Sequence, residues 1–124
     1  MASVWSQIGS NIVGEAIGDN SGAWTSVSLS ADGSVVAIGA HHNDGSGTSS
    51  GHVRIYQNIG GSWTQVGSDI DGEAAGDNSG YAVSLSTDGS VVAIGAPRND
   101  GNGLDSGHVR IYQNVGGSWT QVGS

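Results

Sequence analysis

The stretch VVAIGA at residues 35–40 returns unchanged at residues 91–96, and HVRIYQ at residues 52–57 returns at residues 108–113. Between residues 35–68 and 91–124 only six of 34 positions differ, namely 41, 42, 46, 48, 49 and 59. A repeat of this length is one structural unit that stacks on its neighbours. The chain is therefore two copies of one unit, produced by recent duplication or by deliberate consensus design.

Each copy contains four short stretches typical of β-strands, separated by Gly, Asp, Asn and Ser. The first stretch of each copy alternates Ser with Val and Leu, which is the two-residue period of a strand. An Asp-Gly pair follows it, and Asp-Gly is a strong hairpin signal. Four antiparallel strands per repeat form the blade of a β-propeller. The expected strands are residues 25–30, 35–39, 52–57 and 62–67, and residues 81–86, 91–95, 108–113 and 118–123.

The outer strand of the blade occurs three times, as VWSQI at residues 4–8 and as SWTQV at residues 62–66 and 118–122. The chain thus divides into an extra copy of the outer blade strand (1–10), blade 1 (11–68) and blade 2 (69–124). We expect the extra copy to be an edge strand that points at the outer position of a preceding blade. Two blades leave two faces uncovered, and repeat units need neighbours to bury them. This predicts a cyclic homo-oligomer, with a six-bladed trimer favoured over an eight-bladed tetramer.

The amino-acid composition disfavours several classes of binding partner and site. The chain has 3 basic and 11 acidic residues and a net charge of −8, which disfavours binding to nucleic acid or to anionic membranes. It has no cysteine, so it cannot form a disulfide or a thiolate metal site. We find no apolar run long enough to span a bilayer and no segment typical of a secretion signal. The predicted partners are further copies of the chain and a glycan.

Three motifs carry a resemblance to a known family. GYAVS at residues 80–84, VAIGAP at residues 92–97 and GHVRIY at residues 107–112 resemble the FG-GAP repeat of integrin-like β-propellers. The resemblance implies a non-enzymatic scaffold, adhesion module or lectin, with an extracellular or cell-surface location. The sequence departs from the family in the turn after the first strand, where Asp32-Gly33 and Asp88-Gly89 replace a longer calcium-binding loop. It also supplies two blades where such propellers usually have seven.

Nine of the eleven carboxylates fall in the long connections on one face of the predicted blades. Hard cations prefer several oxygen ligands at alternate positions, which makes two acidic strings candidate calcium ligands. In the first copy both strings have fewer carboxylates. A calcium-dependent adhesion fragment is therefore one alternative function. The candidate metal ligands are Asp100, Asn102 and Asp105, and Asp69, Asp71 and Glu73.

The first copy carries two more residues than the second before its first strand, and Trp24 lies in this insertion. We expect the insertion to form a bulge beside the central channel. An exposed Trp can stack on a sugar, so a carbohydrate-binding lectin is the main alternative function. His41 and His42 are also candidate ligand-binding residues, and we expect their side chains to point apart. No nucleophile-base pair is indicated, so we predict no enzyme, no catalytic residue and no required cofactor.

Overall fold

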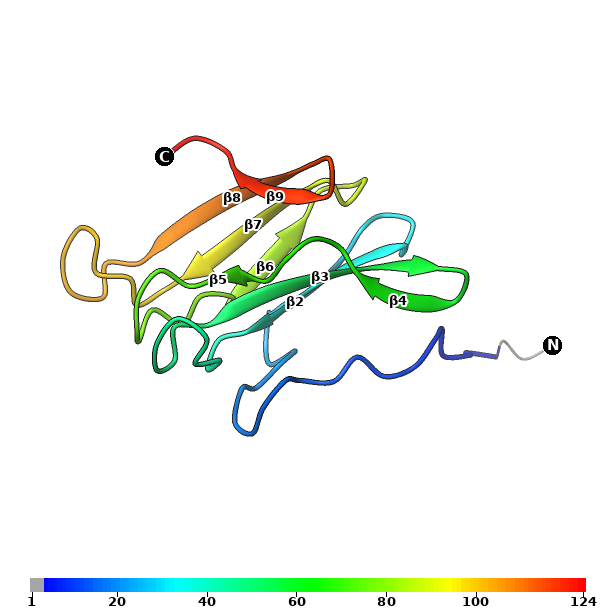
Figure 1. Cartoon of the computed structure of the whole chain (residues 1–124), viewed down its shortest axis with the longest axis horizontal. Helices are drawn as coiled ribbons and strands as arrows, with labels where there is room; N and C mark the ends of the chain where they lie inside the picture. Colours follow the sequence, from blue (N-terminus) through cyan, green and yellow to red (C-terminus); the bar gives the residue numbers. More distant parts are fainter. Residues whose placement is uncertain (1–3) are drawn as a thin grey trace.

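The computed structural model describes residues 4–124 and contains two antiparallel β-sheets (Figure 1). The first sheet has the order β1-β2-β3-β4, with β5 also paired to β3, and the second has the order β6-β7-β8-β9. These residues form no helix, so they contain no helix long and apolar enough to cross a membrane. The strands are β1 (Val27–Leu29), β2 (Val35–Ala40), β3 (His52–Ile59), β4 (Ser62–Gln65), β5 (Ile70–Asp71), β6 (Ala82–Leu85), β7 (Val91–Ala96), β8 (His108–Val115) and β9 (Ser118–Gln121).

The two sheets confirm the predicted four-stranded repeat. The first two strands of each sheet are joined by a turn that an aspartate closes, because the Oδ1 of Asp32 accepts hydrogen bonds from the backbone N–H and the hydroxyl of Ser34. Asp88 does the same for Ser90 in the second sheet. These bonds stabilise the carboxylate and lower the pKa of both aspartates. Each sheet is a propeller blade in strand number and order.

The strand β5 was not predicted. It pairs with the start of β3, on the same edge that β4 occupies further along, with Ile70 opposite Val53 and Asp71 opposite His52. Residues 66–69 lie between the two pairings, so the outer strand is interrupted by a bulge and then resumes. The second sheet has no counterpart of β5 within residues 4–124.

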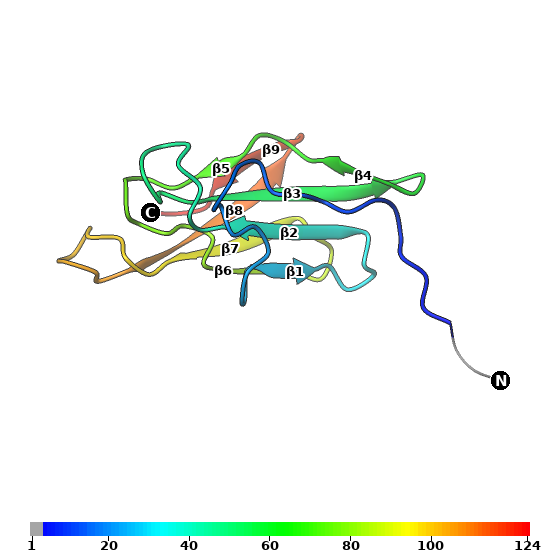
Figure 2. The same ribbon diagram turned by 90° about the horizontal axis from the view of Figure 1, so that it is seen from below.

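The hydrophobic core lies between the two sheets, which pack face to face (Figure 2). We call this contact the blade interface. Partly buried side chains of Val66, Leu85 and Trp119 pack at its margin. The buried core residues are Val35, Ala37, Val53, Ile55 and Ile70 from the first sheet and its outer segment, and Val83, Val92, Ile94 and Tyr112 from the second sheet.

The N-terminal segment, residues 4–17, runs along the side of the first sheet that faces away from the second sheet (Figures 1 and 2). The Trp63 indole N–H donates to the carbonyl of Ile8 at 2.9 Å, as the Trp119 indole N–H donates to the carbonyl of Val66 at 2.9 Å. The segment therefore follows the path of an outer strand from a preceding blade, as predicted.

Residues 4–8 are nevertheless not a strand, which corrects the prediction of an extra edge strand within the chain. Backbone pairing needs a neighbouring strand, and the strand next to this position belongs to a preceding blade that the single chain does not contain. Residues 1–3 of the predicted extra copy lie outside the described residues.

Candidate functional site

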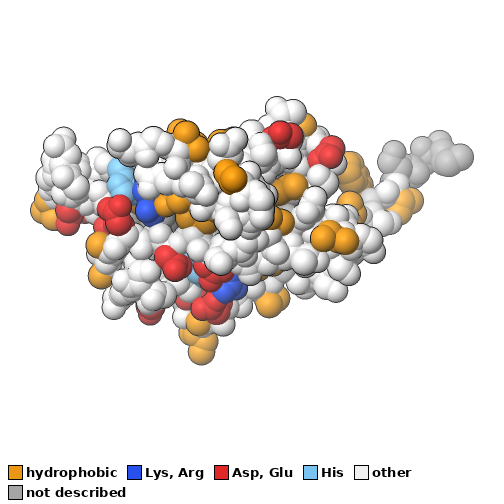
Figure 3. Space-filling view, turned by 45° about the horizontal axis from the view of Figure 1, so that its top comes forward, with side chains coloured by type: hydrophobic (Ala, Val, Ile, Leu, Met, Phe, Trp, Pro, Cys, Tyr) orange, Lys and Arg blue, Asp and Glu red, His pale blue; other side chains and the backbone are white. Residues whose placement is uncertain are grey.

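The end of the molecule that carries the long loops holds most of the acidic side chains, together with arginine and histidine (Figure 3). Two of the predicted loop carboxylates are buried and structural. Asp19 accepts a hydrogen bond of 2.9 Å from the Asn43 side chain, and Asp77 accepts one of 2.8 Å from Asn99. Each pair ties the loop before the first strand to the loop after the second strand. The sequence missed this role, because Gly-Asp-Asn segments are typical of exposed turns.

The loops before β3 and β8 have the same internal bonds. The carboxylate of Asp44 accepts from the backbone N–H of Ser49 at 2.8 Å, and that of Asp100 accepts from Asp105 at 2.7 Å. The backbone of Asn102 donates to the Ser106 hydroxyl at 3.3 Å. Two of the candidate calcium ligands, Asp100 and Asn102, thus contribute to the shape of their own loop.

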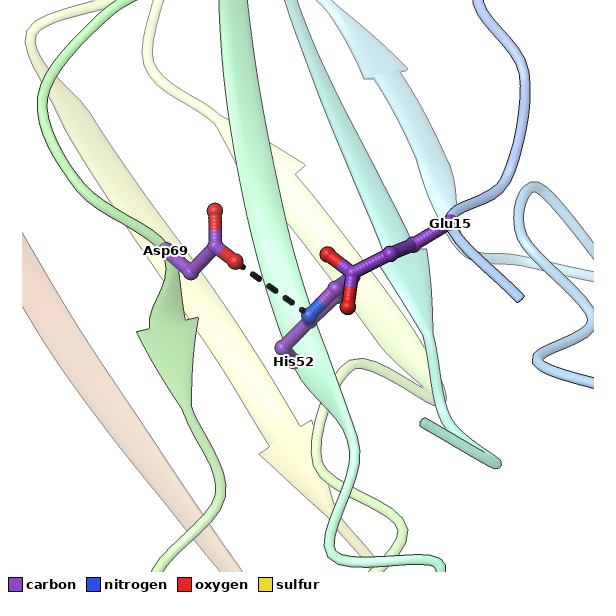
Figure 4. Close-up of side chains that lie close together, drawn as sticks. All are labelled: Glu15, His52 and Asp69. Carbon is purple, nitrogen blue, oxygen red and sulfur yellow. Dashed lines mark ion pairs between the residues drawn. The ribbon is translucent and has the colours of Figure 1, made fainter. Parts of the chain in front are cut away.

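A second group of charges surrounds Arg54 on β3. Its Nε donates to Asp69 at 2.8 Å, and its Nη2 forms an ion pair with Glu15 of the N-terminal segment. The hydrogen bond from Arg54 lowers the pKa of Asp69, and Asp69 in turn raises the pKa of Arg54. His52, which is buried, lies 3.7 Å from Asp69 through its Nδ1 (Figure 4).

Glu15, His52 and Asp69 are the one group of three potential metal ligands among residues 4–124 (Figure 4). Arg54 already forms ion pairs with both carboxylates of this group, Glu15 and Asp69. Of the six candidate calcium ligands the group contains only Asp69. Asp71 and Glu73 lie beside Arg110, whose Nη2 donates to the Asp71 carbonyl at 2.9 Å and whose Nη1 is 3.9 Å from Glu73. The structure thus distributes the six candidate ligands over three places.

The three candidate ligand-binding residues, in contrast, come together. The Trp24 ring centroid lies 5.1 Å from that of His41 and 5.4 Å from that of Tyr81. His41 and His42 are in edge contact at 4.3 Å, which corrects the expectation that they point apart. They lie in a turn after β2, and the alternation of side chains applies only to extended strands.

The insertion that contains Trp24 forms the predicted bulge. The N–H of Gly22 donates to the carbonyl of Gly39, and the N–H of Gly39 donates to Ser26, so residues 23–25 loop out between the two bonds. Trp24 has a φ of 51°, in the left-handed region that a bulky residue rarely adopts. The insertion thereby turns an indole out of the sheet at the loop end.

His41 is 1% exposed, and neither of its ring nitrogens has a hydrogen-bond partner. Burial lowers the pKa of His41, and the neighbouring His42 lowers it further. Its backbone carbonyl accepts a hydrogen bond of 3.0 Å from the Asn78 side chain in the second repeat. The imidazole is therefore neutral at pH 7 and is held at the contact between the two blades.

Trp24, His41 and His42 line a cavity of about 650 Å³ between the two blades at the loop end. The sequence did not predict that the second blade contributes to this cavity. A signal for it was present, because several lining positions are among the few that differ between the two copies. The other lining residues are Ser49, Gly76, Asn78, Tyr81, Pro97, Arg98 and Asp105.

Comparison with known protein families identifies the repeat. Residues 63–112, from β4 into β8, match the FG-GAP repeat. No curated protein matches the chain.

Proposed function

The chain carries an FG-GAP repeat, a structural and binding repeat of β-propeller type, and we propose that it is a self-assembling propeller module whose copies join head to tail. In this proposal the contact between copies repeats the blade interface within the chain. The module is a non-enzymatic scaffold. FG-GAP repeats typically occur in extracellular or surface proteins, and we propose the same location here.

The observation that supports the proposal is that residues of the blade interface recur on the two outer faces of the pair of sheets. We call these outer faces the free faces. Val53 is 0% exposed inside the blade interface, whereas its counterpart Val109 in the second blade is 63% exposed. On the opposite face, Val83 is 9% exposed and its counterpart Val27 is 50% exposed. Each free face thus carries the residues that complement the other free face, as in a head-to-tail interface between identical subunits.

The edge of β8 supports the same arrangement. In the first blade Ile70 of β5 pairs with Val53, and the sequence counterpart of Ile70 is Ile12 in the N-terminal segment. A second copy would place its Ile12 against Val109, where no β5 is present. The segment already has the required local structure, because Gln7 donates to Asn11 at 2.8 Å as Gln65 donates to Asp69 at 2.6 Å.

Burial of the free faces supplies the driving force. Five apolar side chains are about half exposed, and complete burial of one such side chain contributes about 2 kcal/mol, so one interface between copies gains about 5 kcal/mol. A closed ring of two-bladed chains has an even number of blades. We propose a trimer, because six blades leave a narrower central channel than eight. The five side chains are Val27, Leu29, Val109, Ile111 and Val122.

Native mass spectrometry and light scattering of the 124-residue chain test the assembly. Val109→Asp places a charge in the proposed contact and should give monomers. Val115→Asp is the matched control, because Val115 is 58% exposed and its counterpart Ile59 stays 58% exposed beside the blade interface that already exists. Assembly should survive this control. A wild-type monomer, or equal assembly of both variants, would contradict the proposal.

Carbohydrate binding is a second candidate function, and the cavity lined by Trp24 favours it. It is compatible with assembly, because the cavity lies at the loop end, between the two blades of one chain. Calcium-dependent adhesion has weaker support, since the candidate ligands Asp69, Asp71 and Asp105 belong to three separate groups.

A further inference from the structure

The cavity between the blades is the place where the two copies of the repeat differ. Six positions differ between residues 35–68 and 91–124, and at three of them both members of the pair line the cavity. These pairs are His41 and Pro97, His42 and Arg98, and Ser49 and Asp105. Three of the six differences between the copies therefore lie at this cavity.

The cavity has an aromatic wall. Trp24 is 70% exposed although it is the largest apolar side chain type, and its ring lies beside those of His41 and Tyr81. It is present because of the two-residue insertion and is held at a positive φ. An exposed indole at a strained backbone position is costly for folding alone, which points to a role in contacting a ligand.

The rest of the lining includes one basic side chain, Arg98, and one acidic side chain, Asp105. Arg98 and Asp105 are exposed, and among residues 4–124 neither side chain forms an ion pair or a hydrogen bond. His41 adds a buried imidazole with two unpartnered nitrogens at the base of the aromatic wall. The lining therefore offers hydrogen-bond donors and acceptors around one cavity, with one positive and one negative charge.

We propose, on the basis of carbohydrate binding as the second candidate function, that this cavity binds a neutral saccharide. In this proposal the apolar face of a pyranose ring stacks on Trp24, and its hydroxyl groups bond to Arg98 and Asp105. A pyranose has one apolar face and a rim of hydroxyl groups that both donate and accept, which matches a cavity lined by an indole, a guanidinium and a carboxylate. The balanced charge disfavours an anionic or cationic ligand. The volume of about 650 Å³ lies within the range of small-molecule sites.

Saturation-transfer difference NMR with the methyl glycosides of glucose, galactose, mannose and N-acetylglucosamine tests the proposal, with glucuronate as the charged comparison. At least one neutral glycoside should bind and shift the indole N–H resonance of Trp24 in a ¹⁵N spectrum. Trp24→Ala should weaken binding about tenfold, because stacking on one aromatic ring contributes on the order of 1–2 kcal/mol. Trp5→Ala is the matched control, since Trp5 lies in the N-terminal segment and is 96% exposed.

Asp105→Asn and Arg98→Gln extend the test to the charged side chains of the lining, and both change exposed side chains without a folding role. Each should weaken binding of the same glycoside and leave the far-ultraviolet circular dichroism spectrum unchanged. The proposal is overturned if none of the neutral glycosides binds, if binding is the same in the Trp24→Ala variant, or if glucuronate alone binds.

Discussion

The duplicated repeat allows one substitution to be made twice, once inside the blade interface and once on the free face that is proposed to join copies. Ile55 is 1% exposed in the core, and its counterpart Ile111 is 43% exposed. Truncation of a buried Ile to Ala costs about 3 kcal/mol of unfolding free energy, and the cost falls as the side chain becomes exposed. In a single chain, Ile55→Ala should therefore cost about 3 kcal/mol and Ile111→Ala about 1–2 kcal/mol.

Assembly should change only the cost of Ile111→Ala. When copies join head to tail, Ile111 becomes buried as Ile55 is, and its truncation should then also cost about 3 kcal/mol. The measurement is urea unfolding followed by circular dichroism, at a protein concentration below assembly and at one above it. Ile55→Ala should give the same loss at both concentrations, whereas the loss for Ile111→Ala should increase to match it.

A second pair of positions provides the control. Ile59 and Val115 are both 58% exposed, although only Ile59 belongs to the sheet face that is already covered. Ile59→Ala and Val115→Ala should each cost less than about 1 kcal/mol at either concentration. If the chain assembles but Ile111→Ala remains the milder of the first pair, the copies join through another surface and the reasoning is refuted.

Four further predictions concern the termini, His41, Asp69 and calcium. Deletion of residues 1–9 should weaken the oligomer without unfolding the blades. Deletion of residues 117–124 should be rescued by the N-terminal copy of the outer strand. If the first deletion leaves the stability of the oligomer unchanged on dilution, the N-terminal segment has no role between copies. His41 has a lowered pKa, so the unfolded chain binds a proton at higher pH than the folded chain, and stability should fall as the pH drops below about 6.5. His41→Phe should remove this pH dependence of stability and raise the unfolding free energy by about 1–2 kcal/mol, because two unpartnered nitrogens leave the interior. A variant with the pH profile of the wild type would show that His41 does not cause the dependence. Asp69 has a lowered pKa, so its contribution to folding stability is complete above about pH 4 and is lost on further acidification. Asp69→Asn should therefore flatten the plot of melting temperature against pH in this acidic range. An unchanged slope would mean that Arg54 does not stabilise the carboxylate. Calcium chloride and sodium chloride of equal ionic strength should raise the melting temperature equally, because the candidate ligands lie in three places, and a larger effect of calcium would support a specific site.

Most of the fold could be predicted from the sequence because its signals are local. The alternation of Ser with Val and Leu, the Asp-Gly turns and the repeat together predict all eight strands of the two blades. The strand β5 has no such signal. It is two residues long and follows a bulge, so only its pairing with β3 makes it a strand. The burial of Asp19 and Asp77 was missed for a related reason, because it depends on Asn43 and Asn99 from a distant loop.

The candidate site was predictable in part. Trp24 was found because an insertion breaks an otherwise regular repeat, and the two histidines because they replace Pro97 and Arg98. Tyr81 and Asn78 were not found, since they are ordinary residues until packing of the blades brings them beside Trp24 and His41. Contact across the blade interface is a property of the packed pair of sheets, and neither repeat shows it alone.

The proposed assembly also determines how many saccharide sites a ring would contain. Joining through a repeated interface requires that both copies keep the same interface residues, so the loop end is where they are free to differ. At a contact between copies, Pro97, Arg98 and Asp105 would occupy the places that His41, His42 and Ser49 hold inside the chain. The two kinds of contact alternate around the ring, and only the one inside the chain combines the buried His41 with Tyr81. Calorimetric titration with a glycoside that binds should therefore give one site per chain, and two equivalent sites per chain would mean that the histidines and Tyr81 do not define the site.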